Sequence, residues 1–275
     1  MYLCILELIN HQMENILNFT DHGKGETIVF LHGFCESIQI WDQFKLHFKD
    51  FRIICIDLPG HGKSKGLGVD TIIEKLSDAV NRTLSSLNLN RYILVGHSLG
   101  GYVTITYAGK YHNKLAGFCL FHSSAHEDSS EKKESRDKTA EYVLKHGVEV
   151  FANPFVPPLF YSKRKEELKD DINFATTIAK KMRTEDIVNT IVAMRDRKER
   201  ISVLIKAKIP VAFIVGKDDT GVPLEISLSQ CYLPKFSSVL FLAETGHMGM
   251  FERELECALF LKGFFGQVYG IPTTA

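Results

Sequence analysis

Six short apolar runs alternate with longer segments of helical character along this chain of 275 residues. The runs are rich in Val, Ile and Phe, and Gly, Pro or polar clusters bound them. Because they are nearly continuous rather than alternating in polarity, they are typical of strands buried on both faces of a mostly parallel sheet. The runs cover residues 27–31, 52–56, 92–95, 115–121, 210–215 and 238–242. The alternation predicts an α/β fold, in which helices flank a mostly parallel sheet.

The alternation stops between residues 123 and 205, where no segment has a convincing strand pattern. Residues 128–146 are strongly polar, and Gly147 is placed to end a helix there. Thr184 is suited to cap another helix, because apolar residues recur at helical spacing behind it. We therefore predict a core of residues 1–122 and 206–275, with residues 123–205 inserted as a helical cap.

The composition argues against several classes of protein. The chain has 33 basic and 33 acidic residues, so nothing indicates binding to nucleic acid or to an anionic membrane. No apolar run is long enough to cross a bilayer. Residues 1–8 are apolar but carry no Lys or Arg, which favours an edge strand over a signal peptide. Six cysteines without a C-x-x-C pair predict reduced thiols and a cytoplasmic location.

The pentapeptide Gly96-His97-Ser98-Leu99-Gly100 follows one of the predicted strands directly. Its pattern is G-x-S-x-G, in which the glycines allow the sharp turn from strand to helix and the serine stands at the tip. A serine hydroxyl is a weak nucleophile and needs a base to take its proton. The pentapeptide therefore makes Ser98 a candidate nucleophile, provided that a histidine and a carboxylate meet it.

Both partners are available after later strands, where side chains meet at the carboxyl edge of a parallel sheet. His247 follows the last predicted strand, and the preceding glycine allows the loop to aim the ring inward. Asp218 and Asp219 follow the strand before it, and spacing from Gly216 and Pro223 favours Asp219 while leaving Asp218 open. The order Ser98, Asp219, His247 is the order expected of a hydrolase with a nucleophile elbow.

A tetrahedral intermediate also needs donors for its oxyanion. The backbone N–H of Leu99, next to the serine, is one candidate. The segment His32-Gly33-Phe34 follows the first predicted strand, and Gly33 allows close backbone approach, so the N–H of Phe34 is the second candidate. No metal and no organic cofactor is expected for this chemistry.

These segments together resemble the α/β-hydrolase superfamily, of the capped, single-chain serine hydrolase type. The resemblance rests on His32-Gly33-Phe34, the stretch 57–64, the elbow 96–101 and the loops that carry Asp219 and His247. It covers the predicted core and is weak in the cap. Relatives that open epoxides or remove halides carry an aspartate at the elbow, so Ser98 disfavours both reactions.

The resemblance implies hydrolysis of a small or medium carboxylic ester through an acyl-enzyme. Apolar side chains are expected to line a pocket between elbow and cap for this acyl substrate, namely Phe34, Met248, Phe155, Leu159 and Phe160. The same triad also supports cleavage of carbon–carbon bonds, lactones or thioesters. A further alternative is a ligand sensor of low turnover that recruits a protein partner through its cap. The residues indicate no particular oligomeric state.

Overall fold

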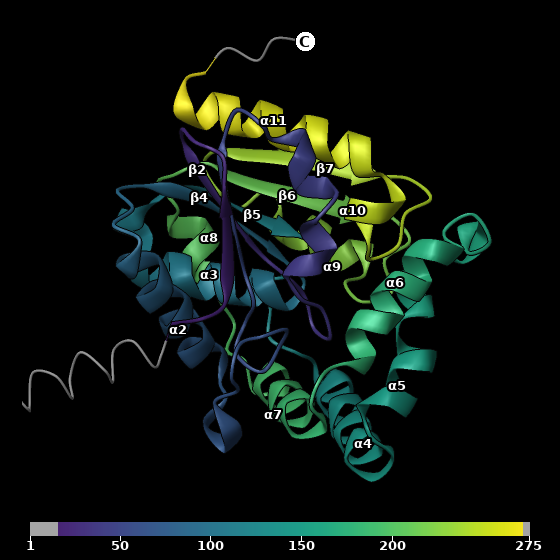
Figure 1. Ribbon diagram of the computed structural model, residues 1–275. Helices are drawn as coiled ribbons and strands as arrows, with labels where there is room; N and C mark the ends of the chain where they lie inside the picture. The colour runs from purple at the N-terminus through teal and green to yellow at the C-terminus, as the bar shows by residue number, and fades with distance from the viewer. Residues whose placement is uncertain (1–15, 272–275) are drawn as a thin grey trace, which may run out of the picture.

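Seven strands form a single sheet in the computed structural model, which describes residues 16–271 (Figure 1). Their order is β1-β3-β2-β4-β5-β6-β7. Strand β1 runs antiparallel to β3, and every other neighbouring pair is parallel. The strands are β1 (Phe19–His22), β2 (Thr27–Leu31), β3 (Arg52–Ile56), β4 (Tyr92–His97), β5 (Leu115–Phe121), β6 (Val211–Gly216) and β7 (Ser237–Leu242). The predicted α/β class with a mostly parallel sheet is therefore confirmed.

Burial of the strands follows their place in the sheet. The central strands β2, β4, β5 and β6 are buried at every residue, as their continuous apolar sequences predict. Strand β7 departs from the prediction of burial on both faces, because it forms one edge of the sheet and is mostly exposed or half-buried. Strand β1 forms the other edge. The edge strand predicted over residues 1–8 lies outside the described residues.

Helices cover both faces of the sheet, with α11 on one face and α2, α3 and α8 on the other (Figure 1). The helices are α2 (Ile73–Ser86), α3 (Leu99–Tyr111), α4 (Ser130–His146), α5 (Val148–Phe155), α6 (Lys169–Lys180), α7 (Thr184–Arg195), α8 (Ile201–Lys206), α9 (Leu224–Gln230), α10 (Gly249–Glu252) and α11 (Glu254–Tyr269). Between β2 and β3 the chain forms two 3₁₀ turns, Ile38–Trp41 and Phe44–His47. The tighter turns place the buried rings of Trp41 and Phe44 against Phe30 of β2.

Helices α4 to α7 form a layer of their own beside the carboxyl end of the sheet (Figure 1). Helix α4 packs against α5 and α7, and α5 packs against α6. Residues 123–205, all of them described, contain no strand. Helix α8 instead packs against α3. The division at residues 122 and 206 stays a prediction. No helix within residues 16–271 is long and apolar enough to cross a membrane.

Candidate active site

Ser98 lies at a sharp turn between the end of β4 and the start of α3. Its backbone has φ 49° and ψ −113°, a conformation that residues other than glycine rarely adopt. The turn presses closely on β2, because a Cβ added to Gly100 would lie 2.5 Å from the carbonyl oxygen of Leu31. The glycine is required by this approach, and the strained turn presents the serine at the carboxyl edge of the sheet.

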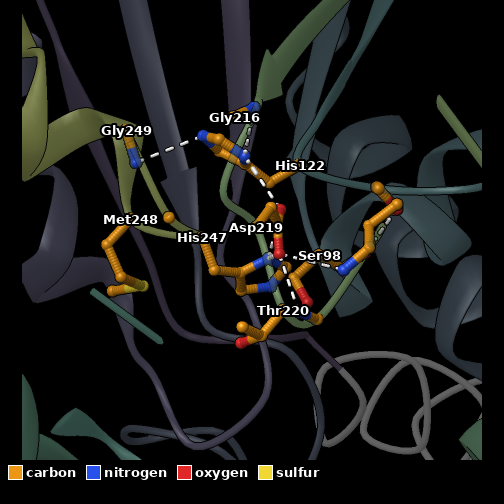
Figure 2. A network of polar contacts seen from close by, with 12 residues as sticks. Ser98, His122, Gly216, Asp219, Thr220, His247, Met248 and Gly249 are labelled. Carbon is orange, nitrogen blue, oxygen red and sulfur yellow. Dashed lines mark hydrogen bonds and ion pairs between the residues drawn. The ribbon is translucent and has the colours of Figure 1, made fainter. Parts of the chain in front are cut away.

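Asp219 and His247 meet beside this turn, as Figure 2 shows. His247 Nδ1 lies 2.9 Å and 2.8 Å from the two carboxylate oxygens of Asp219. The backbone N–H groups of Gly221 and Val222 donate to Asp219 Oδ1 at 2.8 Å and 2.9 Å. Asp218, the alternative acid, is exposed, whereas Asp219 is buried. The structure thus brings Asp219, and not Asp218, to the histidine.

The charges of this pair are mutually stabilised. Burial alone would raise the pKa of Asp219, but the charge of His247 and the hydrogen bonds from His122 and His247 hold it well below its usual range. Burial lowers the pKa of His247, but the charge and hydrogen bond of Asp219 outweigh burial, so the pKa is raised above its ordinary value. The arrangement therefore couples an ionised carboxylate to a histidine that can accept a proton.

The loop that carries His247 is held by a buried carboxylate from the following helix. Glu252 accepts the N–H of Gly246 at 3.0 Å and that of Met248 at 3.1 Å, on either side of the histidine. Its other oxygen accepts the N–H of Tyr161 at 2.9 Å. The N–H of His247 itself donates to the carbonyl of Leu159 at 2.6 Å. The position of the ring is thus set jointly by Glu252 of α10 and by Leu159 in the segment after α5.

Ser98 and His247 line one cavity of about 210 Å³ between the sheet and helices α4, α5 and α7. Both Ser98 and His247 lie within the described residues 16–271, and no hydrogen bond joins Ser98 Oγ to the His247 ring. Such contacts are often long in ligand-free enzymes and shorten when substrate binds. The cavity is lined by Phe34, Ser98, Tyr102, Lys132, Ser135, Arg136, Thr139, Phe151, Phe155, Leu159, Ile191, Met194, Gly221 and His247.

Three of the five side chains expected to line the pocket do so, and two do not. Phe34, Phe155 and Leu159 line the cavity. Phe160 does not, because it is buried and its ring packs against Phe251 at a centroid distance of 6.1 Å. Met248 is buried as well, and Figure 2 shows its side chain directed away from Ser98. Neither residue lines this cavity, and the part of all five in substrate binding stays a prediction.

The two candidate oxyanion donors lie on opposite sides of the elbow. Leu99 is the first residue of α3, where backbone N–H groups have no partner within the helix. Phe34 follows β2, in a loop held by the N–H of Gly33, which donates to a carboxylate oxygen of Glu36 at 2.5 Å. That glutamate also lies 3.0 Å from His97 Nδ1, inside the elbow. Phe34 and Leu99 thus belong to loops that are tied to each other, and their role as donors stays a prediction.

Several residues of the site were not anticipated from the sequence. Lys132 and Arg136 bring positive charge to the cavity from α4. Arg136 forms an ion pair with Asp128, whereas Lys132 Nζ donates to the carbonyl of Gly221 at 3.1 Å. His122, directly after β5, contacts Asp219. Its place at the end of a strand is evident from the sequence, whereas its contact with Asp219 is not.

One group of described residues has the composition of a metal site. Potential ligand atoms of His122, Asp219 and His247 lie within 4.8 Å of one another, and no other described group does so. The atoms already bond to each other, since both histidines use Nδ1 toward the aspartate. A bound ion would have to replace the contacts that orient His247. The arrangement therefore fits a hydrogen-bonded network better than a metal centre.

Comparison with known proteins identifies the family. Residues 26–254 match the profile of the alpha/beta hydrolase fold, and the chain belongs to this family. Among curated proteins, it is 31% identical over 159 residues to 2-succinyl-6-hydroxy-2,4-cyclohexadiene-1-carboxylate synthase of Escherichia coli (strain K12), covering 54% of this chain and 62% of that one. The synthase of Citrobacter koseri is 42% identical over 92 residues, or 34% of this chain and 35% of the other. These matches span only about a third to six-tenths of those relatives.

A solved structure extends the likeness to the whole chain. The thermophilic esterase from Thermogutta terrifontis, described with malate bound, superposes with a TM-score of 0.87. The two chains are 26% identical, and the match covers 92% of this chain and 93% of the other. The likeness therefore includes the helices between β5 and β6 as well as the sheet.

Proposed function

We propose that this protein hydrolyses carboxylic esters through an acyl-enzyme. The observation that supports this most is the buried Asp219–His247 pair on the same cavity as the strained Ser98. Ser98 Oγ attacks the acyl carbonyl while His247 takes its proton, and the N–H groups of Phe34 and Leu99 hold the oxyanion. His247 then protonates the leaving alcohol. Water, activated by the same histidine, releases the acid.

The test is turnover of p-nitrophenyl esters by the wild type and by Ser98→Ala. Loss of a serine nucleophile lowers kcat by about 10⁴ to 10⁶ in comparable hydrolases, so the variant should be nearly inactive. A fluorophosphonate labels an activated serine, because the serine oxygen bonds to phosphorus and fluoride leaves. This labelling should be absent in Ser98→Ala. Turnover that survives in Ser98→Ala would overturn the proposal. Labelling of the wild type without turnover of any acyl substrate would instead favour the sensor.

We further propose that the ester carries a carboxylate. Apolar side chains such as Phe34, Phe155 and Leu159 line the cavity, and α4 adds the cations Lys132 and Arg136. They are four residues apart on one helix, where like charges repel each other. Arg136 is paired with Asp128, but Lys132 Nζ is held only by a backbone carbonyl among the contacts described here. The malate bound to the related esterase is itself a dicarboxylate.

A pair of substrates tests this specificity. In Lys132→Met, kcat/KM for p-nitrophenyl hemisuccinate should fall about 10-fold, because a charge-assisted contact is lost, while p-nitrophenyl butyrate should change less than about twofold. Lys133→Met is the matched control, since Lys133 Nζ pairs with Glu127 at 2.9 Å on the surface. Equal losses on both esters would refute the proposal that the substrate carries a carboxylate. The proposal of ester hydrolysis would be unaffected.

The names of the curated relatives supply a second candidate, synthesis of 2-succinyl-6-hydroxy-2,4-cyclohexadiene-1-carboxylate. Those alignments cover at most about six-tenths of the two named chains, whereas the esterase is matched along almost its whole length. Ester hydrolysis is therefore the first choice. Formation of the named product by the wild type, together with no turnover of esters, would reverse the order.

A further inference from the structure

A second histidine contacts Asp219 in addition to His247. His122 Nδ1 lies 3.1 Å from Asp219 Oδ2, and the ring is completely buried. Figure 2 shows the Asp219 carboxylate in contact with both His122 and His247. His122 does not line the cavity, so it has no direct route to a substrate. Its effect on chemistry must pass through the aspartate.

The surroundings of His122 determine which ring nitrogen carries the proton. The N–H of Gly249 lies 3.2 Å from Nε2, so Nε2 accepts this hydrogen bond and is unprotonated. Nδ1 then carries the proton, and this N–H donates a hydrogen bond to the Asp219 carboxylate. The N–H of Gly216 also lies 3.3 Å from Nδ1, but this longer contact is weaker than the bond to a charged oxygen. The reverse tautomer would place a lone pair against the carboxylate and an N–H against another N–H.

The protein accommodates this ring at some cost. His122 has φ 48°, a left-handed conformation that is uncommon outside glycine, although His, Asn and Asp adopt it more often than other residues. A Cβ added to Gly249 would lie only 2.5 Å from His122 Nε2, so this position after His247 must be occupied by glycine. Burial also lowers the pKa of His122 to about 4, which keeps the ring neutral near pH 7. Strain, close approach and neutrality all preserve one N–H donor at Asp219.

We propose that His122 is a positioning residue whose Nδ1–H holds the Asp219 carboxylate in the orientation that aligns His247. Asp219 Oδ1 accepts the N–H groups of Gly221 and Val222, whereas the partners of Oδ2 among residues 16–271 are the two histidines. Without His122, Asp219 Oδ2 loses a hydrogen-bond donor, and the carboxylate is freer to rotate out of the orientation that aligns His247. This inference rests on the proposed function, because it assigns His122 to the same acyl-transfer site.

The experiment compares His122→Asn with His122→Leu. The two replacements are nearly equal in size and leave similar cavities, but the Asn amide nitrogen stands close to where Nδ1 was and can still donate to Asp219. We would measure kcat and KM on p-nitrophenyl butyrate and the rate of fluorophosphonate labelling of Ser98. His122→Met, whose unbranched and flexible side chain adapts better to the space of the ring, replaces the Leu variant should that chain not fold.

We expect the Leu variant to lose about 10- to 100-fold in kcat and in labelling rate, with KM changed less than about twofold. The Asn variant should recover most of that loss at equal or lower stability, because its donor is retained. Wild-type rates in the Leu variant, or equal losses in both variants, would overturn the proposal. Failure of the wild type to label at all would instead refute the nucleophile, so the two hypotheses fail separately.

Discussion

Two buried histidine–carboxylate pairs lie next to each other at the carboxyl edge of the sheet, and they differ in what their histidines can reach. His247 pairs with Asp219 at 2.8 Å, and His97 pairs with Glu36 at 3.0 Å. The two rings are 5.0 Å apart between centroids. His247 lines the cavity with Ser98, whereas His97 Nε2 lies 2.9 Å from the carbonyl oxygen of His247.

The difference separates a chemical pair from a structural one. Both nitrogens of His97 face oxygen acceptors, so the ring has no edge left for a substrate. Glu36 in turn accepts the N–H of Gly33, and the pair thereby links the Phe34 loop, the elbow and the histidine loop. Among the contacts of the described residues, His247 is bonded through Nδ1, which leaves Nε2 for the serine. A histidine beside a carboxylate is therefore a base only where one nitrogen remains available.

The largest effect should come from removing the charge of Asp219, the carboxylate that pairs with His247. Asp219→Asn retains the size of the side chain but removes the charge that favours the reactive tautomer of His247, so kcat should fall by about 10⁴. Asp218→Asn is the control in the adjacent, exposed position and should leave kcat within about twofold. Steady-state kinetics on p-nitrophenyl butyrate measures both variants. Similar losses in the two would contradict the comparison.

The positions of the three triad candidates could be predicted from the sequence because each follows a strand. The carboxyl ends of parallel strands share one edge of the sheet, so Ser98, Asp219 and His247 come together whatever the loops do in detail. His122 obeys the same rule after β5. Its contact with Asp219 has no local signal in the sequence, because it depends on how the loops after β5 and β6 pack together.

Contacts that depend on the packing of the cap could not be predicted in this way. Lys132 reaches the cavity because of how α4 packs on α5 and α7, and no local pattern encodes that docking. Phe160 and Met248 lie in irregular segments, where sequence spacing does not define a face. The Glu36–His97 pair joins residues 61 positions apart and is visible only once β2 and β4 are neighbours.

An intermediate effect, on stability rather than chemistry, should follow from breaking the structural pair. Glu36→Ala leaves a buried histidine without its carboxylate and frees the N–H of Gly33, so the free energy of unfolding should fall by about 3 to 5 kcal/mol. Glu254→Ala is the matched control: it breaks a half-exposed pair with His47, worth less than about 1 kcal/mol. Urea unfolding followed by circular dichroism measures both. Equal changes would show that the buried pair is no more than a surface contact.

The smallest effect should appear in the pH profile. The pKa of His247 is raised above its ordinary value, so kcat/KM on a neutral ester should decline with falling pH already above about 6.5, as the base becomes protonated. The charge of Glu36 contributes to that raised pKa. Glu36→Gln removes the negative charge, which makes protonated His247 less favourable, and the acid limb should move to lower pH by a few tenths of a unit. Glu254→Gln, at a half-exposed position paired with His47, should leave the limb in place. A limb that stays fixed or moves upward in Glu36→Gln would mean that the two pairs are electrostatically independent, and that the coupling between them is mechanical alone.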